Sequence, residues 1–163
     1  MKLIRPIAAA LALLAAPSAT AQQAPAPKLV VVVSVDQFSA DLLAEYRGQF
    51  REGFARMLSG AVFPSGYQSH GATETCPGHS TILSGARPAR TGIIGNDWID
   101  FSVPREDKTV NCSEDPTVPG SNSNRYTVSP KNLKVSTLGE WMKLANPASR
   151  VVSVAGKDRA ALM

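Results

Sequence analysis

Apolar residues form two kinds of pattern along this chain, continuous runs and helical spacing, and the alternation of the two predicts the fold. Residues 29–35 form a continuous apolar, β-branched run with Ser34 as its one polar residue, which is typical of a strand buried on both faces of a parallel sheet. Ser39 is a candidate helix cap, and apolar side chains then recur at helical spacing until Ser59-Gly60, where the helix should end. The apolar positions of this predicted helix are Leu42, Leu43, Tyr46, Phe50, Phe54, Met57 and Leu58.

The rest of the chain continues the alternation, with one long interruption. Residues 102–134 contain several prolines among Gly, Asn and Ser, and they predict a loop-rich insertion with short hairpin pieces. The other predicted elements are, in order, a strand at 61–63, a helix at 77–83, a turn-rich connection at 87–92, an extended segment within 93–101, a helix at 136–145, a strand at 150–155 and the first turn of a helix at 160–163.

This order of strands and helices predicts an α/β fold with a doubly wound parallel sheet. In such sheets ligands bind beyond the carboxyl ends of the strands. Asp36 and residues 157–159 both follow predicted strands, and Thr75 precedes a predicted helix on the same rim. We therefore expect the functional site at this edge of the sheet.

The first 21 residues have the pattern of an export signal. Lys2 and Arg5 precede an apolar run at 7–16, and Ala19-Thr20-Ala21 is a small-residue cleavage site. Residues 22–28 are a Gln, Ala and Pro linker, so residues 29–163 form the expected domain. The mature chain should be periplasmic or secreted, with no stable membrane insertion after the signal is removed.

Composition adds two limits. Of the 163 residues, 44% are hydrophobic, which is enough for a packed core. The formal net charge of +4 falls to +2 without Lys2 and Arg5, which is too little to indicate a nucleic-acid partner. The two cysteines, Cys76 and Cys112, could form one disulfide in an oxidising compartment or remain two separate thiols, and we favour the bridge.

Thr75 is the candidate nucleophile. It lies just before Cys76-Pro77-Gly78, and a proline suits the first turn of a helix, where its missing N–H would have no partner anyway. The free N–H groups and the dipole at a helix start attract anions. A threonine hydroxyl is a poor nucleophile at neutral pH, so Thr75 would need a group that removes its proton.

Each of the other candidate groups has a structural interpretation as well as a functional one. Asp36 could ligate a metal or cap a turn, and His70 and His79 are expected to be structural. Lys157 and Arg159 could form an anion site or a solvated turn, since arginine grips phosphate with two N–H groups and lysine adds a point charge. Asn96 could be a turn residue, or its amide could donate to a phosphoryl oxygen in the transition state.

Three motifs together resemble a known family. Thr75-Cys76-Pro77-Gly78-His79, Gly92-Ile93-Ile94-Gly95-Asn96 and Gly156-Lys157-Asp158-Arg159 are similar to the motifs of bacterial alkaline phosphatases of the nucleotide pyrophosphatase/phosphodiesterase-like branch. The opening Val33-Ser34-Val35-Asp36 fits as well. The resemblance covers the chain from about Leu29 to Met163.

The resemblance implies an α/β/α sandwich of the alkaline phosphatase superfamily, incomplete at its C-terminal end here, and a site with two zinc ions. Asp36 and the Thr75 oxygen would ligate zinc, and Thr75 would form a phosphothreonine intermediate. The Cys76 N–H, Asn96, Lys157 and Arg159 would hold the phosphate oxygens. Lys157 and Arg159 imply phosphate monoesters as substrates. We expect small-molecule phosphate esters in general, with broad specificity.

The family's remaining metal ligands lie downstream of residue 163, so we expect these 163 residues to be inactive alone as part of a longer enzyme. Two alternatives stay open. One is a phosphodiesterase or nucleotide pyrophosphatase of the same superfamily, and the other is a non-catalytic exported phosphate-binding remnant.

Overall fold

The structure is a computed structural model that describes residues 26–163. The chain divides into two units, Met1–Val33 and Ser34–Met163. Residues 26–33 of the first unit form no helix or strand and are exposed. The predicted export signal and the first part of the linker, residues 22–25, lie outside the described residues. Within residues 26–163, no helix has both the length and the apolar character needed to cross a bilayer.

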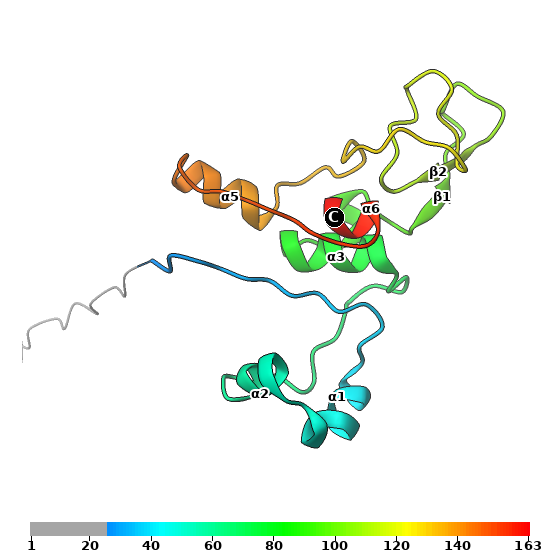
Figure 1. Ribbon diagram of the computed structural model, residues 1–163. Coiled ribbons are helices and arrows are strands. Elements are labelled where there is room, and N and C mark those ends of the chain that lie inside the picture. Colours follow the sequence, from blue (N-terminus) through cyan, green and yellow to red (C-terminus); the bar gives the residue numbers. More distant parts are fainter. Residues whose placement is uncertain (1–25) are drawn as a thin grey trace, which may run out of the picture. The chain divides into compact units, whose positions relative to one another are not determined.

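The second unit is built mainly from short helices (Figure 1). Its elements are, in order, α1 (Ala40–Tyr46), the 3-10 helix η2 (Arg47–Gln49), α2 (Glu52–Leu58), α3 (Thr75–Ser84), α4 (Pro88–Thr91), β1 (Asp97–Ile99), β2 (Thr109–Asn111), α5 (Leu138–Ala145) and α6 (Asp158–Leu162).

The first predicted helix is present but interrupted. Ser39 caps α1 as expected, because its Oγ accepts a hydrogen bond from the Leu42 N–H at 3.2 Å. The backbone becomes extended at Phe50 and Arg51, which ends η2 and separates it from α2. This break brings the Phe50 ring against Phe38 and Phe54, with ring centroids 6.1 and 4.8 Å away. A single continuous helix over this region was therefore a wrong prediction, and aromatic packing accounts for the interruption.

Helix α3 starts two residues earlier than predicted, at Thr75. Pro77 lies in its first turn, where the N–H that proline lacks would have no intrahelical partner. The helix ends at Gly85, whose left-handed backbone (φ 67°) suits glycine. Residues 88–91, predicted as a turn, form the short helix α4, which begins with Pro88.

The core of this unit surrounds the N-terminal end of α3. Cys76 and Cys112 are joined by a disulfide, the pairing that the sequence left open, and both are fully buried. Ile93 and Met163 complete the buried cluster. Trp98, Leu133 and Leu162 pack against this cluster. Because Met163 and Leu162 belong to the end of α6, this cluster also fixes α6 on α3.

Residues 102–134 form the expected loop with a hairpin piece. Strand β2 pairs antiparallel with β1 in a two-stranded sheet, with Trp98 opposite Val110. A buried ion pair organises the loop that follows. Glu114 is fully buried and binds the Arg105 guanidinium, which also donates to the carbonyl oxygens of Thr109 at 2.6 Å and Ser121 at 2.8 Å.

Burial alone would raise the pKa of Glu114, but several donors more than offset it. The Arg105 guanidinium, the Ser121 hydroxyl and the Asn111 N–H donate to this carboxylate and hold its pKa below its ordinary value. Donation to Glu114 likewise raises the pKa of Arg105. Both groups therefore remain charged, and this pair holds Thr109, Asn111 and Ser121 of the loop together.

The three predicted parallel strands are absent from the part of the chain that the structure describes. Residues 29–35, 61–63 and 150–155 form no helix and pair with no strand, and their apolar side chains are exposed. A strand requires a neighbour for its backbone hydrogen bonds, and high β propensity does not replace one. The predicted C-terminal elements fared better: α5 matches the helix expected at 136–145, and α6 the turn expected at 160–163.

Candidate active site

Thr75 and Asp36 lie in direct contact. Thr75 is the first residue of α3 and is 8% exposed. Its hydroxyl donates a hydrogen bond to Asp36 Oδ2 at 3.0 Å, across 39 residues of chain. Asp36 occupies a turn that follows the extended segment, with its side chain half-exposed. The expected nucleophile and the expected metal ligand are thus neighbours at the start of a helix.

His79 faces the same carboxylate, which sequence reasoning missed. It lies one helical turn after Thr75, and its Nε2 is 3.8 Å from Asp36 Oδ1. This nitrogen is buried and has no hydrogen-bond partner among residues 26–163. The spacing of four residues between Thr75 and His79 was the available signal, because such side chains share one face of a helix. An open cleft beside these groups is also lined by Thr73 and Glu74.

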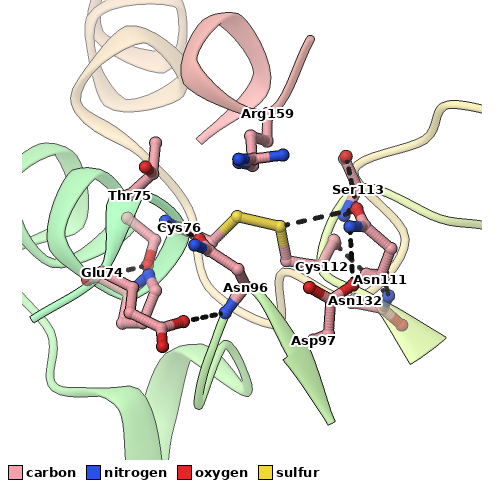
Figure 2. Close-up of a disulfide and its surroundings, with 12 residues drawn as sticks. Glu74, Thr75, Cys76, Asn96, Asp97, Asn111, Cys112, Ser113, Asn132 and Arg159 are labelled. Carbon is pink, nitrogen blue, oxygen red and sulfur yellow. Dashed lines mark hydrogen bonds between the residues drawn. A yellow bond between two sulfur atoms is a disulfide. The ribbon is translucent and has the colours of Figure 1, made fainter. Parts of the chain in front are cut away.

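Asn96 reaches the second residue of α3. Its Oδ1 accepts a hydrogen bond from the Cys76 backbone N–H at 2.9 Å. The Asn96 backbone N–H in turn donates to Glu74 Oε2 at 2.6 Å (Figure 2). The two motifs that contain Thr75 and Asn96 are therefore joined at the end of α3 that favours anions. The Cys76 N–H, expected to contact phosphate, is engaged by Asn96 in this structure.

The two glycines of the second motif lie close to neighbouring backbone. Gly92 has a left-handed backbone (φ 81°), and a Cβ there would lie 2.9 Å from Lys134 Cδ and 3.0 Å from the Asn132 carbonyl oxygen. A Cβ on Gly95 would lie 2.9 Å from the Asp97 carbonyl oxygen. Both positions therefore require glycine for steric reasons.

Arg159 is carried to this region by α6. Figure 2 shows its side chain above the disulfide, between Thr75 and Ser113 in the view. Arg159 Nε is buried and has no hydrogen-bond partner in the described part of the chain. A buried guanidinium nitrogen without a partner is costly, which is consistent with a site that receives an anion. Lys157 is exposed at the N-terminal cap of α6, and no hydrogen bond or ion pair joins it to Thr75 or Asn96 within residues 26–163.

Tyr126 fixes the start of α6. Its hydroxyl donates to Asp158 Oδ2 at 2.8 Å, linking the loop-rich segment to the helix of Arg159. Burial raises the pKa of Tyr126, and the hydrogen bond to Asp158 raises it further. The phenol therefore remains a donor in neutral and mildly alkaline solution.

The donor atoms fit part of a metal site. A carboxylate, a hydroxyl and an unpartnered imidazole nitrogen from Asp36, Thr75 and His79 converge, and zinc accepts oxygen and nitrogen ligands. Residues 26–163 contain no group of three or more His, Cys, Asp or Glu side chains arranged for a metal ion. A metal ion held here would therefore need further ligands.

Comparison with known proteins identifies the family. Residues 30–153 match the family described as type I phosphodiesterase / nucleotide pyrophosphatase. The chain belongs to this family. Its match covers Asp36, Thr75 and Asn96, the residues that the structure joins at the start of α3.

Several proteins with the name alkaline phosphatase are similar to this chain. Alkaline phosphatase PhoK of Sphingomonas sp is 66% identical over 138 residues, covering 84% of this chain and 25% of that protein. Alkaline phosphatase PhoD of Zymomonas mobilis is 61% identical over 136 residues, covering 83% and 23%. Alkaline phosphatase PhoV of Synechococcus elongatus is 39% identical over 152 residues, covering 90% and 27%. The chain thus spans about a quarter of the length of these relatives.

Proposed function

We propose that the full-length protein is an exported, metal-dependent phosphate monoester hydrolase that uses Thr75 as its nucleophile. The observation that carries this proposal is the hydrogen bond from the Thr75 hydroxyl to Asp36 at the start of α3. That position combines a hydroxyl, a nearby anionic acceptor and the positive end of a helix dipole. The names of the relatives support the same activity.

The reaction proceeds in two displacements. The Thr75 oxygen forms a bond to phosphorus while the bond from phosphorus to the leaving alcohol breaks, and the alcohol takes up a proton. Water then attacks the phosphothreonine, releasing inorganic phosphate and restoring the hydroxyl. Zinc ions, held by Asp36, Thr75 and ligands beyond residue 163, would lower the pKa of the hydroxyl and stabilise charge on the attacking and leaving oxygens.

The remaining side chains bind and orient the phosphoryl group. The Asn96 amide and the Cys76 N–H donate to its oxygens, the latter after Asn96 Oδ1 has moved aside. Arg159 and Lys157 neutralise the additional charge that a monoester carries relative to a diester. In the full-length protein we propose the superfamily's α/β/α sandwich, in which residues 29–35, 61–63 and 150–155 are strands, preceded by the signal at 1–21 and the linker at 22–28.

A second activity is favoured by the family's description, which names phosphodiesterases and nucleotide pyrophosphatases. Purified full-length protein assayed with p-nitrophenyl phosphate and with bis-p-nitrophenyl phosphate separates the two. We expect the monoester to have the higher kcat/KM. A preference for the diester would instead assign the diesterase activity and leave Lys157 and Arg159 without their proposed role.

The nucleophile is tested by Thr75→Ala in the full-length protein. Loss of a covalent nucleophile should lower kcat by about 10⁴-fold or more. Thr75→Ser should retain part of the activity and show the mass increase of one phosphoryl group after a rapid acid quench. Thr81→Ala is the matched control, because Thr81 lies in the same helix and its hydroxyl is buried without a partner in the described residues. Full activity of Thr75→Ala would refute the assignment.

A further inference from the structure

Asn96 is held at three of its four polar groups. Its backbone N–H donates to Glu74 Oε2 at 2.6 Å, and its carbonyl oxygen accepts from the Cys112 N–H at 2.8 Å. Its side-chain Oδ1 accepts from the Cys76 N–H at 2.9 Å. The side-chain nitrogen Nδ2 has no hydrogen-bond partner within residues 26–163. Its two N–H groups are therefore the donors that Asn96 has left for a ligand.

The N-terminal end of α3 is capped by a residue outside the helix. Glu74 is the N-cap residue of α3, yet its side chain makes no capping bond to its own helix. Asn96 caps that helix instead, from a segment 20 residues away. In a capping box both acceptors belong to one helix, as Thr137 and Glu140 do at α5. At α3 the two acceptors come from different segments: Asn96 Oδ1 accepts from the Cys76 N–H, and Glu74 Oε2 accepts from the Asn96 N–H.

The backbone around Asn96 is shaped for this contact. A Cβ on Gly95 would lie 3.6 Å from Glu74 Oε2, in ordinary contact, and 2.9 Å from the Asp97 carbonyl oxygen. The loop at Gly95 therefore adopts its tight conformation only without a side chain. Glu74 is exposed, so its bond to Asn96 contributes little to global stability and chiefly fixes a local position.

We propose that Glu74 is a positioning residue: its carboxylate holds the Asn96 backbone so that the Asn96 amide meets the phosphoryl group carried by Thr75. The inference rests on the proposed function, because it assigns Glu74 to the same site. Glu74 touches no substrate in this role and acts through Asn96. Displacement of a donor by about 1 Å can cost up to about a hundredfold in rate.

The test is a double-mutant cycle in the full-length protein, with p-nitrophenyl phosphate as the substrate. Asn96→Ala should lower kcat by about 10²- to 10³-fold, as loss of one transition-state donor does. Glu74→Ala should lower kcat by about tenfold to a hundredfold. The double variant should be no slower than Asn96→Ala, since Glu74 has nothing left to position. Glu74→Gln, which keeps an acceptor oxygen, should recover most of the loss.

Glu140→Ala is the matched control. Glu140 Oε2 also accepts a backbone N–H, that of Thr137 at 2.7 Å, but it does so at α5. Its loss should change the thermal midpoint as much as Glu74→Ala does and leave kcat unchanged. If Glu74→Ala leaves kcat unchanged, or if its effect multiplies with that of Asn96→Ala, the positioning role is refuted. If Asn96→Ala itself has no effect, the failure lies in the proposed function.

Discussion

Residues 74–134 contain all but one of the buried hydrophobic side chains of the described residues, whereas the valine-rich segments at 29–35 and 150–155 expose theirs. Val110 on β2 is 1% exposed, while Val152 and Val154 are 84% and 90% exposed. The residue type is the same in both regions, so hydrophobicity does not explain the difference. What differs is how each region obtains partners for its backbone and side chains.

The buried region supplies its own partners over short distances. One disulfide, one buried ion pair and the bonds around Asn96 connect segments that lie within about 40 residues of each other. The exposed segments require neighbouring strands, which only distant parts of a chain can provide. Local cross-links can therefore join the Cys76 and Asn96 segments of the candidate site without a parallel sheet.

The largest expected effect follows from removal of the disulfide. The Cys76→Ala/Cys112→Ala variant should lower the free energy of unfolding of the full-length protein by about 4 kcal/mol, because the bridge closes a loop over 36 residues. Urea unfolding under non-reducing conditions measures this loss, with reduced wild-type protein as the comparison. A change below about 1 kcal/mol would show that the other contacts suffice to hold the loop.

The same contrast explains which elements the sequence could predict. The helix at α5 and the start of α1 depend on caps within one turn, at Thr137 and Ser39, so local patterns identify them. The interruption at Phe50 depends on ring packing between separate segments, and no local period encodes it. The strands predicted at 29–35, 61–63 and 150–155 are not formed, because β propensity is a local property of the sequence whereas strand pairing needs a distant partner.

The site divides in a similar way. Motif spacing led to Thr75, Asp36 and Asn96, which the structure brings together, and to Arg159, which α6 carries to the same region. Glu74 gave no signal, because a carboxylate that binds a backbone N–H 22 residues away leaves no pattern in the sequence. Only coordinates could show such a contact.

A smaller effect on the free energy of unfolding is expected from substitution of one valine in each of the two regions. If residues 150–155 form a buried strand in the full-length protein, Val152→Ser should cost about 2 kcal/mol of unfolding free energy, as loss of a buried valine does. Val151 already packs against α5, where its Cγ1 lies 2.8 Å from the position of a Cβ on Gly139. Val110→Ser, in the buried region, is the reference and should cost a similar amount. If Val110→Ser lowers the free energy of unfolding by about 2 kcal/mol and Val152→Ser leaves it unchanged, the proposal that residues 150–155 form a buried strand of an α/β/α sandwich is contradicted.

The smallest effect concerns acid stability of the loop-rich segment. The Lys131 ammonium, followed by the Thr117 hydroxyl and N–H, holds the pKa of Asp115 at about 2, below its ordinary value of 3.8. Because the folded-state pKa is the lower one, the carboxylate's stabilising contribution is complete above about pH 4 and is lost as the pH falls towards 2. Urea midpoints measured at pH 7, 4 and 3 should therefore stay level to pH 4 and then fall. Asp115→Asn should lower the midpoint at pH 7 and fall less steeply below pH 4. If the urea midpoint falls equally steeply with pH in both proteins, other carboxylates determine the loss of stability in acid.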